Sequence, residues 1–431
     1  MSLKKIPVEQ LRVGLFILLD GSWTDYPFMF RSFKIKNEKQ IRIIREVGMK
    51  TILYDPARSD VKPIQHDLPD ESVEPEVQEQ EIQEPEVSDE IGEKNILQEA
   101  FEEKNNRIQQ LKERRVSLNR CEKAFTESVG AVKNLMNNMR ARPRESLIAA
   151  EELVGDIVGT VSQDQNVSMQ LVNMKGQDES SYFHIINVTM LSLIMGKELG
   201  LDEMEMNHLG VGAMLHDFGQ LKVPDKILRK KTPLTDSERK IYELHPRLGA
   251  ELALKIGSLP KAVIEIMEQH HEHEDGSGYP NKLKTGQISK LSKIVAVANA
   301  YDDYCNKVSN EKLLTPYEAM SYMYSQEKFD KKILSIFINR LGVYPPGTLV
   351  RLSDGPVAGV TAVNHHDLLN PQVVVYDAEI PKEEAAIIDL SEEEHLKIEE
   401  SIRRNEVPAE MLSYLNFGGS VNYFLDPSAK S

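Results

Sequence analysis

The chain has 431 residues, with 52 Lys or Arg against 68 Asp or Glu, so its formal net charge is −16. This balance argues against a general nucleic-acid binder or a protein that binds anionic membranes, because both need clustered positive charge. Hydrophobic residues make up 40% of the chain, which is enough for packed cores, and the length predicts two or three domains.

The start of the chain, MSLKKIPVEQL, has no apolar signal region, so we do not expect export. The longest nearly uninterrupted apolar run, Val188–Met195, is far shorter than the roughly 20 residues that span a bilayer. Cys121 and Cys305 cannot form a disulfide framework. The sequence therefore predicts a cytoplasmic protein without membrane insertion.

A small α/β domain is predicted over residues 1–62. Leu11–Leu19 and Lys50–Tyr54 have the composition of strands, and Glu38–Glu46 has the apolar spacing of a helix. The domain also holds a group of aromatic residues, which we interpret as core rather than as a ligand-binding box: Trp23, Tyr26, Phe28, Phe30 and Phe33.

Residues 63–94 are predicted to be an acidic, disordered linker. From Asp67 to Glu93 there are 12 acidic residues and no Lys or Arg, and the tetrapeptide EPEV occurs twice. A segment so rich in charge and so poor in aromatic residues cannot bury enough apolar surface to fold. The alternative is an acidic docking segment.

Residues 95–164 are predicted to form a helical stalk. Alternating steps of four and three from Leu97 to Met139 pass through thirteen positions, of which ten are apolar. Such an imperfect heptad stripe is typical of a helix that pairs with another, so a homodimer is expected, although the stripe could instead pack on its own chain. A second helix should follow Pro143 and end near Val161.

Residues 165–340 show helical patterns with short breaks, and residues 341–431 are predicted to be a β-rich segment and tail. The sequences TLVRLSDG, GVTAV and QVVVYDAE have the character of short strands between turns. A final helix is predicted near Glu392–Arg403, followed by a ragged tail.

The helical region carries histidines in two local patterns. His216 and Asp217 follow an apolar helical run and precede a break at Gly219. His270 and His271 fall near the end of another helical run, which leads into a tight loop with the sequence GSGYP. Adjacent residues at a helix end can point about 100° apart, so a carboxylate there could bridge two metal ions while its neighbouring imidazole holds one.

Two further histidines lie in helical segments, His184 in YFHIINVTMLSLIMG and His245 in HPRLGAELAL. Neutral imidazoles and carboxylates are the ligand set of Fe, Mn or Zn, and two such ions about 3.5–4 Å apart can clamp a phosphodiester. Each histidine alone is more often structural. All of them together, in this order and before a GYP loop, favour a metal site.

On these residues the sequence resembles the HD-GYP phosphodiesterases, a branch of the HD superfamily. The resemblance covers roughly residues 170–330. The N-terminal domain is similar to a domain of unknown function that often precedes HD-GYP domains. The matching motifs are His216-Asp217, VPDKIL with Lys230 and Leu234-Thr235, His245, HHEHEDGSGYP and VAVANAYDDYCN.

The resemblance implies an all-helical, metal-dependent domain that hydrolyses cyclic di-GMP to pGpG or GMP. Asp217 would bridge two metals and Lys230 would steady a phosphate as the second catalytic residue. The loop Gly278, Tyr279 and Pro280 would support the site and contact a protein partner. The implied metal positions are His184, His216, Asp217, His245, His270, His271 and Asn299.

The sequence departs from the family pattern at several positions. Gln220 replaces the usual lysine after the His-Asp pair, and Asn299 replaces a metal-binding aspartate. Ser180 replaces the glutamate of members with three metals, so we expect two divalent ions, Fe or Mn. Val308-Ser309-Asn310 replaces an Arg-Pro-Tyr sequence that holds substrate phosphate, and the adjacent Lys307 could substitute for it.

As a whole, the sequence predicts a multidomain protein with a mainly α-helical HD-type metal phosphohydrolase domain, a small α/β N-terminal domain, a helical stalk and a short β-rich C-terminal segment. The favoured function is cyclic di-GMP hydrolysis. The altered positions Gln220, Asn299 and Val308 motivate an alternative, a degenerate member that binds cyclic di-GMP or a partner without turnover. A nucleotide phosphohydrolase with another substrate is a third hypothesis, which the GYP loop argues against.

Overall fold

The computed structural model divides the chain into two compact units, Met1–Glu113 and Arg114–Ser431, and each is described by itself. The structure describes residues 3–20, 25–28, 31–64, 90–163, 168–174, 180–230, 232–306, 313–353, 355–378, 380, 382, 385, 387–393, 396–417 and 419–426.

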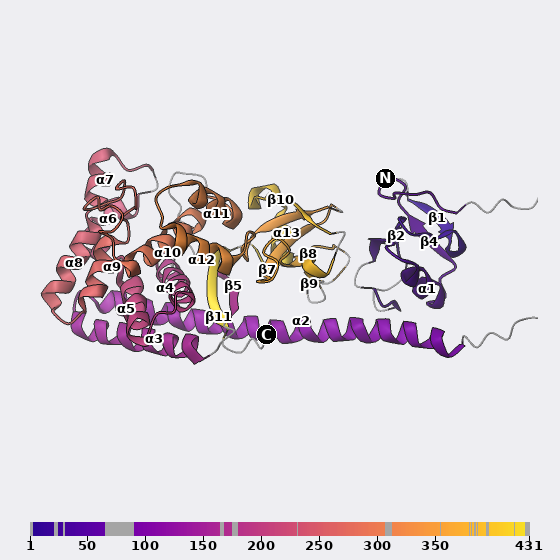
Figure 1. Cartoon of the computed structure of the whole chain (residues 1–431), viewed down its shortest axis with the longest axis horizontal. Coiled ribbons are helices and arrows are strands. Elements are labelled where there is room, and N and C mark those ends of the chain that lie inside the picture. The colour runs from indigo at the N-terminus through magenta and orange to yellow at the C-terminus, as the bar shows by residue number, and fades with distance from the viewer. Residues whose placement is uncertain are drawn as a thin grey trace, which may run out of the picture. The chain divides into compact units, whose positions relative to one another are not determined.

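The first unit contains a four-stranded antiparallel sheet with the strand order β1-β4-β2-β3, and one short helix (Figure 1). The helix α1 (Glu38–Glu46) has the predicted bounds. Asn37 caps it by accepting a hydrogen bond from the backbone of Gln40, and the apolar face of the helix is buried. The strands are β1 (Lys4–Pro7), β2 (Phe16–Leu18), β3 (Ser32–Lys34) and β4 (Thr51–Tyr54).

The predicted strand Leu11–Leu19 was too long, because Gly14 has a φ of 95° and the chain turns there before β2 begins. Tyr26 is buried, and Phe28 packs against Phe33 with 4.8 Å between ring centroids. Trp23 and Phe30, like residues 65–89 of the predicted acidic linker, lie outside the described residues.

The helix α2 (Glu90–Asn138) has 49 residues and is therefore about 73 Å long. In the first unit its Lys104 is buried and donates a hydrogen bond to the carbonyl of Tyr26 at 2.7 Å. In the second unit Phe125 and Val132 are buried in the core that α2 shares with α3 (Pro143–Gln163). This half of the predicted stripe thus packs on its own chain, and the homodimer stays a prediction.

The second unit is mainly helical, as predicted, and α4 lies at its centre (Figure 1). Residues 185–196 of α4 are buried on every side of the helix, which is what an apolar sequence without a polar face requires. The α-helices of this region are α4 (Ser180–Glu198), α5 (Glu203–Leu215), α6 (Asp225–Leu228), α7 (Asp236–Tyr242), α8 (His245–Ile256), α9 (Lys261–Gln269), α10 (Lys290–Asn306), α11 (Pro316–Ser325) and α12 (Lys331–Leu341), with the 3-10 helix η4 (Phe218–Lys222). No helix in the described ranges is long and apolar enough to span a membrane.

The C-terminal strands form a five-stranded antiparallel sheet with the order β10-β6-β7-β8-β9. The three predicted strand regions are confirmed as β6, β7 and β8, although residues 354 and 379 lie outside the described residues. The strands of this sheet are β6 (Leu349–Leu352), β7 (Val357–Ala362), β8 (Gln372–Val375), β9 (Ile387–Asp389) and β10 (Ile398–Ile402).

The predicted helix at Glu392–Arg403 is wrong, because this stretch contains β10; residues 394 and 395 lie outside the described part of the chain. Ile398 and Ile402, four residues apart, fit a helix face as well as a strand, so the sequence pattern could not decide. The strand forms because it pairs with β6, where Arg351 and Glu400 make a cross-strand ion pair at 3.0 Å.

The predicted ragged tail is also wrong over its described part. It contains the helix α13 (Ala409–Leu415) and the strand β11 (Ser420–Asp426). β11 pairs antiparallel with β5 (Ser168–Met174), a strand in the region where only helices were expected. The pairing brings the end of the chain against α4 and α10 (Figure 1).

Candidate metal centre

The predicted ligands converge because the ends of several packed helices meet. His216 follows the last residue of α5, with Asp217 directly after it, and His270 follows the last residue of α9. His245 is the first residue of α8, and His184 lies in the first turns of α4. α5 packs against both α4 and α9, and α9 packs against α8, so these five side chains point toward one another.

One group of candidate ligands contains His184, His216 and Asp217. The Nε2 atoms of the two imidazoles lie 3.2 Å apart. Asp217 Oδ2 lies 3.5 Å from His216 Nε2 and 3.8 Å from His184 Nε2. One carboxylate oxygen therefore faces both imidazole nitrogens.

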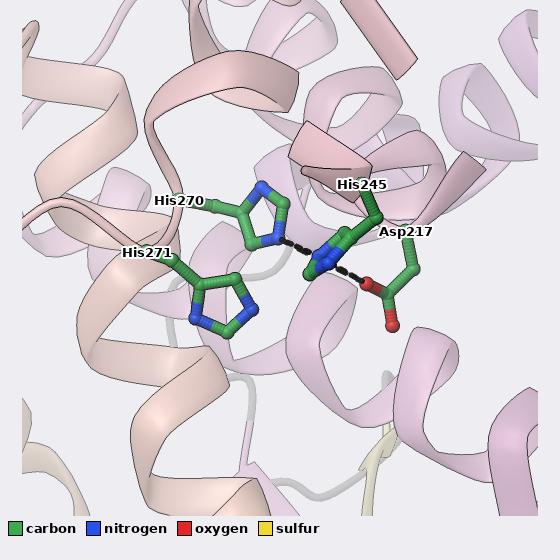
Figure 2. A group of neighbouring side chains, drawn as sticks. All are labelled: Asp217, His245, His270 and His271. Carbon is green, nitrogen blue, oxygen red and sulfur yellow. Dashed lines mark hydrogen bonds and ion pairs between the residues drawn. The ribbon is translucent and has the colours of Figure 1, made fainter. Parts of the chain in front are cut away.

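The second group contains His245, His270, His271 and again Asp217 (Figure 2). The Nε2 atoms of His245 and His270 are also 3.2 Å apart. The other carboxylate oxygen, Asp217 Oδ1, lies 3.2 Å from His245 Nε2 and 3.9 Å from His270 Nε2. Asp217 thus presents one oxygen to each group, which is the geometry of a bridging ligand.

Hydrogen bonds at the opposite ring nitrogens fix how these imidazoles are oriented. In His216, His245 and His270 the Nδ1 atom contacts the backbone carbonyl three residues earlier, so Nδ1 donates to that carbonyl and Nε2 faces the other candidate ligands. Nδ1 of His184 donates instead to Asp302 Oδ2 at 2.6 Å. The three carbonyl contacts are Ala213 at 2.6 Å, Tyr242 at 2.8 Å and Met267 at 2.9 Å.

This donor set fits divalent metal ions. The two Nε2 atoms of each pair are only 3.2 Å apart, so a proton or a metal ion must lie between or beside them to offset the repulsion of their lone pairs. Two nitrogens bound to one ion, each about 2.1 Å from it at roughly 90–110°, are about 3.0–3.4 Å apart, which matches the observed spacing. Imidazoles with a carboxylate suit Fe, Mn or Zn.

The pKa shifts of the cluster also fit a site for positively charged ions. Burial alone would raise the pKa of Asp217, but the charge and hydrogen bonds of His216 and His245 hold it well below its usual value. Burial and the neighbouring imidazoles lower the pKa of His270. Burial would also lower the pKa of His184, but the hydrogen bond to Asp302 and nearby carboxylates raise it to about 9. The site thus holds an ionised carboxylate, and the carboxylates around His184 favour positive charge on its ring.

The GYP loop packs directly on the end of α9. The backbone N–H of Tyr279 donates to the carbonyl of His271 at 3.1 Å, and the two rings stack with 4.6 Å between centroids. The buried Glu272 carboxylate accepts from the backbone of Asn281 and Leu283, at 2.7 and 2.8 Å, and so fixes the segment after Pro280. The loop therefore determines where the His271 ring lies.

Two glycines allow close backbone approach around the site. A Cβ on Gly278 would lie 2.4 Å from the carbonyl oxygen of His271, so the loop can pack this closely only with glycine at position 278. A Cβ on Gly219 would lie 1.9 Å from the carbonyl oxygen of His245. Gly219 thus lets η4, which follows Asp217, pack against the start of α8.

Three other residues that the sequence analysis singled out, Asn299, Lys230 and Gln220, do not belong to either group of candidate ligands. Asn299 is buried on α10, with its Nδ2 3.5 Å from His271 Nδ1, so it borders the second group as an amide. Lys230 pairs with Glu238, whose pKa this hydrogen bond lowers to about 2. Gln220 lies in η4. Lys307 and Val308-Ser309-Asn310 lie outside the described residues.

The sequence reasoning missed the residues that support His184. Asp302 and Asn306 lie in the motif VAVANAYDDYCN and Asn187 lies in the segment around His184, but none of the three received a role. All three are polar residues within largely apolar helical stretches, and Asn187 and Asp302 are buried. Such residues must find hydrogen-bond partners in the core, and that was the signal that could have identified them.

Two family models match the chain. One is described as a domain of unknown function (DUF3391) and matches residues 3–150, and the other is described as an HD domain and matches residues 162–333. The expected combination of domains is confirmed. The first match extends beyond the predicted domain 1–62 and includes α2 and the first turns of α3.

Several curated proteins are similar to this chain. Cyclic di-GMP phosphodiesterase PA4108 of Pseudomonas aeruginosa is 30% identical over 379 residues, which cover 87% of this chain and 85% of that protein. Cyclic di-GMP phosphodiesterase PdeB of Borreliella burgdorferi is 29% identical over 183 residues, 42% of this chain and 48% of that protein. A 3'3'-cGAMP-specific phosphodiesterase 2 of Vibrio cholerae is 29% identical over 158 residues, 36% and 30% of the two chains.

Proposed function

This chain belongs to the HD-GYP family of cyclic di-GMP phosphodiesterases, and on that premise we propose that it hydrolyses cyclic di-GMP to pGpG or GMP with two divalent metal ions. The observation that carries the proposal is the arrangement of Asp217, whose two oxygens face two separate imidazole pairs. A single structural zinc site would need only one such group.

The residues of this chain would hold one ion between His184, His216 and Asp217, and the other between Asp217, His245, His270 and His271. When bound, two such ions lower the pKa of water and neutralise phosphate charge, which is the chemistry that phosphodiester hydrolysis needs. Iron or manganese suits this set of imidazoles and one carboxylate.

The protein itself supplies position and shielding. Hydrogen bonds at Nδ1 hold the imidazoles with their Nε2 atoms turned toward the site, and His216, His245 and His270 are buried, so little reorganisation is needed on binding. Lys230 pairs with Glu238 and has further N–H donors that could contact a phosphate oxygen.

Two wider proposals accompany this one. Gly278, Tyr279 and Pro280 support the second group of ligands, and their position beside the site makes the loop a candidate contact for a protein partner. The setting we propose is the cytoplasm, because both cysteines are free and buried, as expected in a reducing compartment.

The test is metal analysis combined with a turnover assay. The full chain is purified without oxygen, loaded with Fe²⁺ or Mn²⁺ and incubated with cyclic di-GMP or 3'3'-cGAMP. We expect two ions per chain and linear products from cyclic di-GMP. The variant His245→Ala should lose metal and product, whereas the matched control His208→Ala, outside both ligand groups, should keep them. A wild-type chain without bound metal would overturn the proposal.

The second candidate function is a receptor that binds cyclic di-GMP or a partner without turnover. The observation that favours it is the amide of Asn299 beside His271, where the family has a carboxylate, together with Gln220 in place of lysine. A neutral amide is a weaker ligand than a carboxylate. Retention of cyclic di-GMP without product, by a chain that holds two ions, would select this function.

A further inference from the structure

The C-terminal strand β11 is hydrogen-bonded to the helix that carries Asp302. The Asn306 side chain, at the end of α10, makes two bonds to the backbone of Val421: its Nδ2 donates to the carbonyl at 2.7 Å, and its Oδ1 accepts from the N–H at 2.8 Å. The same Nδ2 also donates to Asp302 Oδ1 at 2.8 Å. The amide thus joins the strand and the carboxylate.

A second asparagine makes the same link from α4. Asn187 is fully buried, and its Oδ1 accepts from the backbone N–H of Tyr423 at 3.1 Å. Its Nδ2 donates to Asp302 Oδ1 at 2.8 Å and also lies 3.2 Å from the carbonyl of Val421. Asn187 is three residues after His184, on the same helix.

Asp302 is consequently held at both of its oxygens. Oδ1 accepts from Asn187 and Asn306, and Oδ2 accepts from His184 Nδ1 at 2.6 Å. A carboxylate buried to 2% exposure needs hydrogen-bond donors at both of its oxygens, because burying them without partners is costly. With Oδ1 fixed by two amides, Oδ2 has only a narrow range of positions, and it sets the orientation of the His184 ring.

We propose that Asn187 and Asn306 are positioning residues of the metal site, through which β11 at the end of the chain holds Asp302 and thereby orients His184 toward its ion. The inference rests on the proposed function, since it assumes that His184 is a ligand. Removing a residue that supports a metal ligand typically lowers metal affinity about 10–100-fold. The C-terminal strand would therefore influence the occupancy of one metal position and leave the other unaffected.

The alternative is that these bonds only hold the strand in place. The structure offers a control for this, because the Tyr423 hydroxyl holds the same strand through hydrogen bonds to Tyr301 and Pro346 rather than to Asp302. Its hydroxyl lies 2.8 Å from the Tyr301 hydroxyl and donates to the carbonyl of Pro346 at 3.0 Å. Tyr423→Phe removes these bonds, while the backbone N–H of residue 423 can still donate to Asn187.

The experiment is an equilibrium titration of the full chain with Mn²⁺, with metal per chain and thermal unfolding measured for wild type, Asn306→Ala and Tyr423→Phe. We expect two ions for wild type. Asn306→Ala should bind one ion as wild type does and the other about 10–100-fold more weakly. Tyr423→Phe should lose stability and keep both affinities. Asn187→Ala, which removes the other donor to Asp302, should repeat the pattern if Asn306→Ala does not fold.

The outcomes separate the two proposals. If wild type binds no Mn²⁺, both the proposed function and this inference are overturned. If wild type binds two ions and a folded Asn306→Ala or Asn187→Ala variant binds both equally well, only the inference fails. Equal losses of affinity in Asn306→Ala and Tyr423→Phe would also overturn it, because general loosening of the strand would then explain the effect.

Discussion

The two imidazole pairs that face Asp217 are supported in different ways. His245 and His270 are oriented by backbone carbonyls three residues earlier, so their support lies within the same short segment. In the other pair, His184 is oriented by Asp302, which is 118 residues away, and Asp302 depends in turn on asparagines that contact β11. One pair is held locally and the other partly by the tertiary fold.

This difference has a practical consequence. Substituting a side chain does not remove a backbone carbonyl that orients an imidazole. Mutations can therefore alter the orientation of His245 and His270 only by replacing these ligands or by changing how the backbone around them packs. The His184 side can be weakened by a side chain that never touches a metal. Perturbations of the two sides should therefore affect the two proposed metal positions differently.

The largest effect is expected from Asp217→Ala. This variant should lose metal from both ligand groups, so the two groups would no longer differ. The carboxylate serves both ligand groups, so we expect loss of metal and of hydrolysis together. Metal analysis and the turnover assay are the measurements, and the exposed Asp225→Ala on α6 is the matched control. Unchanged metal content in Asp217→Ala would contradict the bridging role.

Asp302→Ala should separate the two positions. Without its acceptor, His184 loses its orientation, and we expect an affinity for one ion about 10–100-fold lower while the other is unaffected. Mn²⁺ titration measures this. Asp330→Ala is the control, because it removes a helix cap on α12 and lowers stability without touching the cluster. Equal weakening of both ions by Asp302→Ala would show that the supports are not independent.

Gly219→Ala should disturb the pair His245 and His270 by displacing the backbone of His245. The added Cβ would lie 1.9 Å from the carbonyl oxygen of His245, so η4 and α8 must separate, and we expect a loss of about 1–3 kcal/mol in the free energy of unfolding. Urea unfolding measures it. Gly155→Ala on α3, where a Cβ meets nothing within 4 Å, should be neutral or stabilising by up to about 1 kcal/mol. Similar unfolding free energies for both variants would contradict the inference that η4 and α8 pack closely only because residue 219 is glycine.

The smallest effect is expected from Asn299→Asp. A carboxylate at this position beside His271 would add a negative charge and a stronger ligand, so metal affinity should rise several-fold. Mn²⁺ titration and the turnover assay are the measurements. Weaker metal binding together with lower activity would show that Asn299 is not an impaired ligand position.

Sequence patterns predicted the helices and the positions of the candidate ligands on them well where the reasons are local. α1 and α3 follow from apolar spacing with Asn37 or Pro143 at the start, and the placement of His216 and His270 at helix ends follows from the breaks after them. The same kind of pattern wrongly predicted a helix for residues 392–403. The apolar spacing of this segment fits a helix or a strand, and pairing with β6 makes it a strand.

What the sequence by itself determined is a set of candidate donors, several imidazoles and one carboxylate at or near helix ends, in an order typical of the family. Only the tertiary structure decided that two imidazole pairs face opposite oxygens of Asp217, and that β11 reaches back to Asp302 through Asn187 and Asn306. The physical reason is that an amide or carboxylate in a helix can bond many partners, and only the packing of distant segments selects which one it meets.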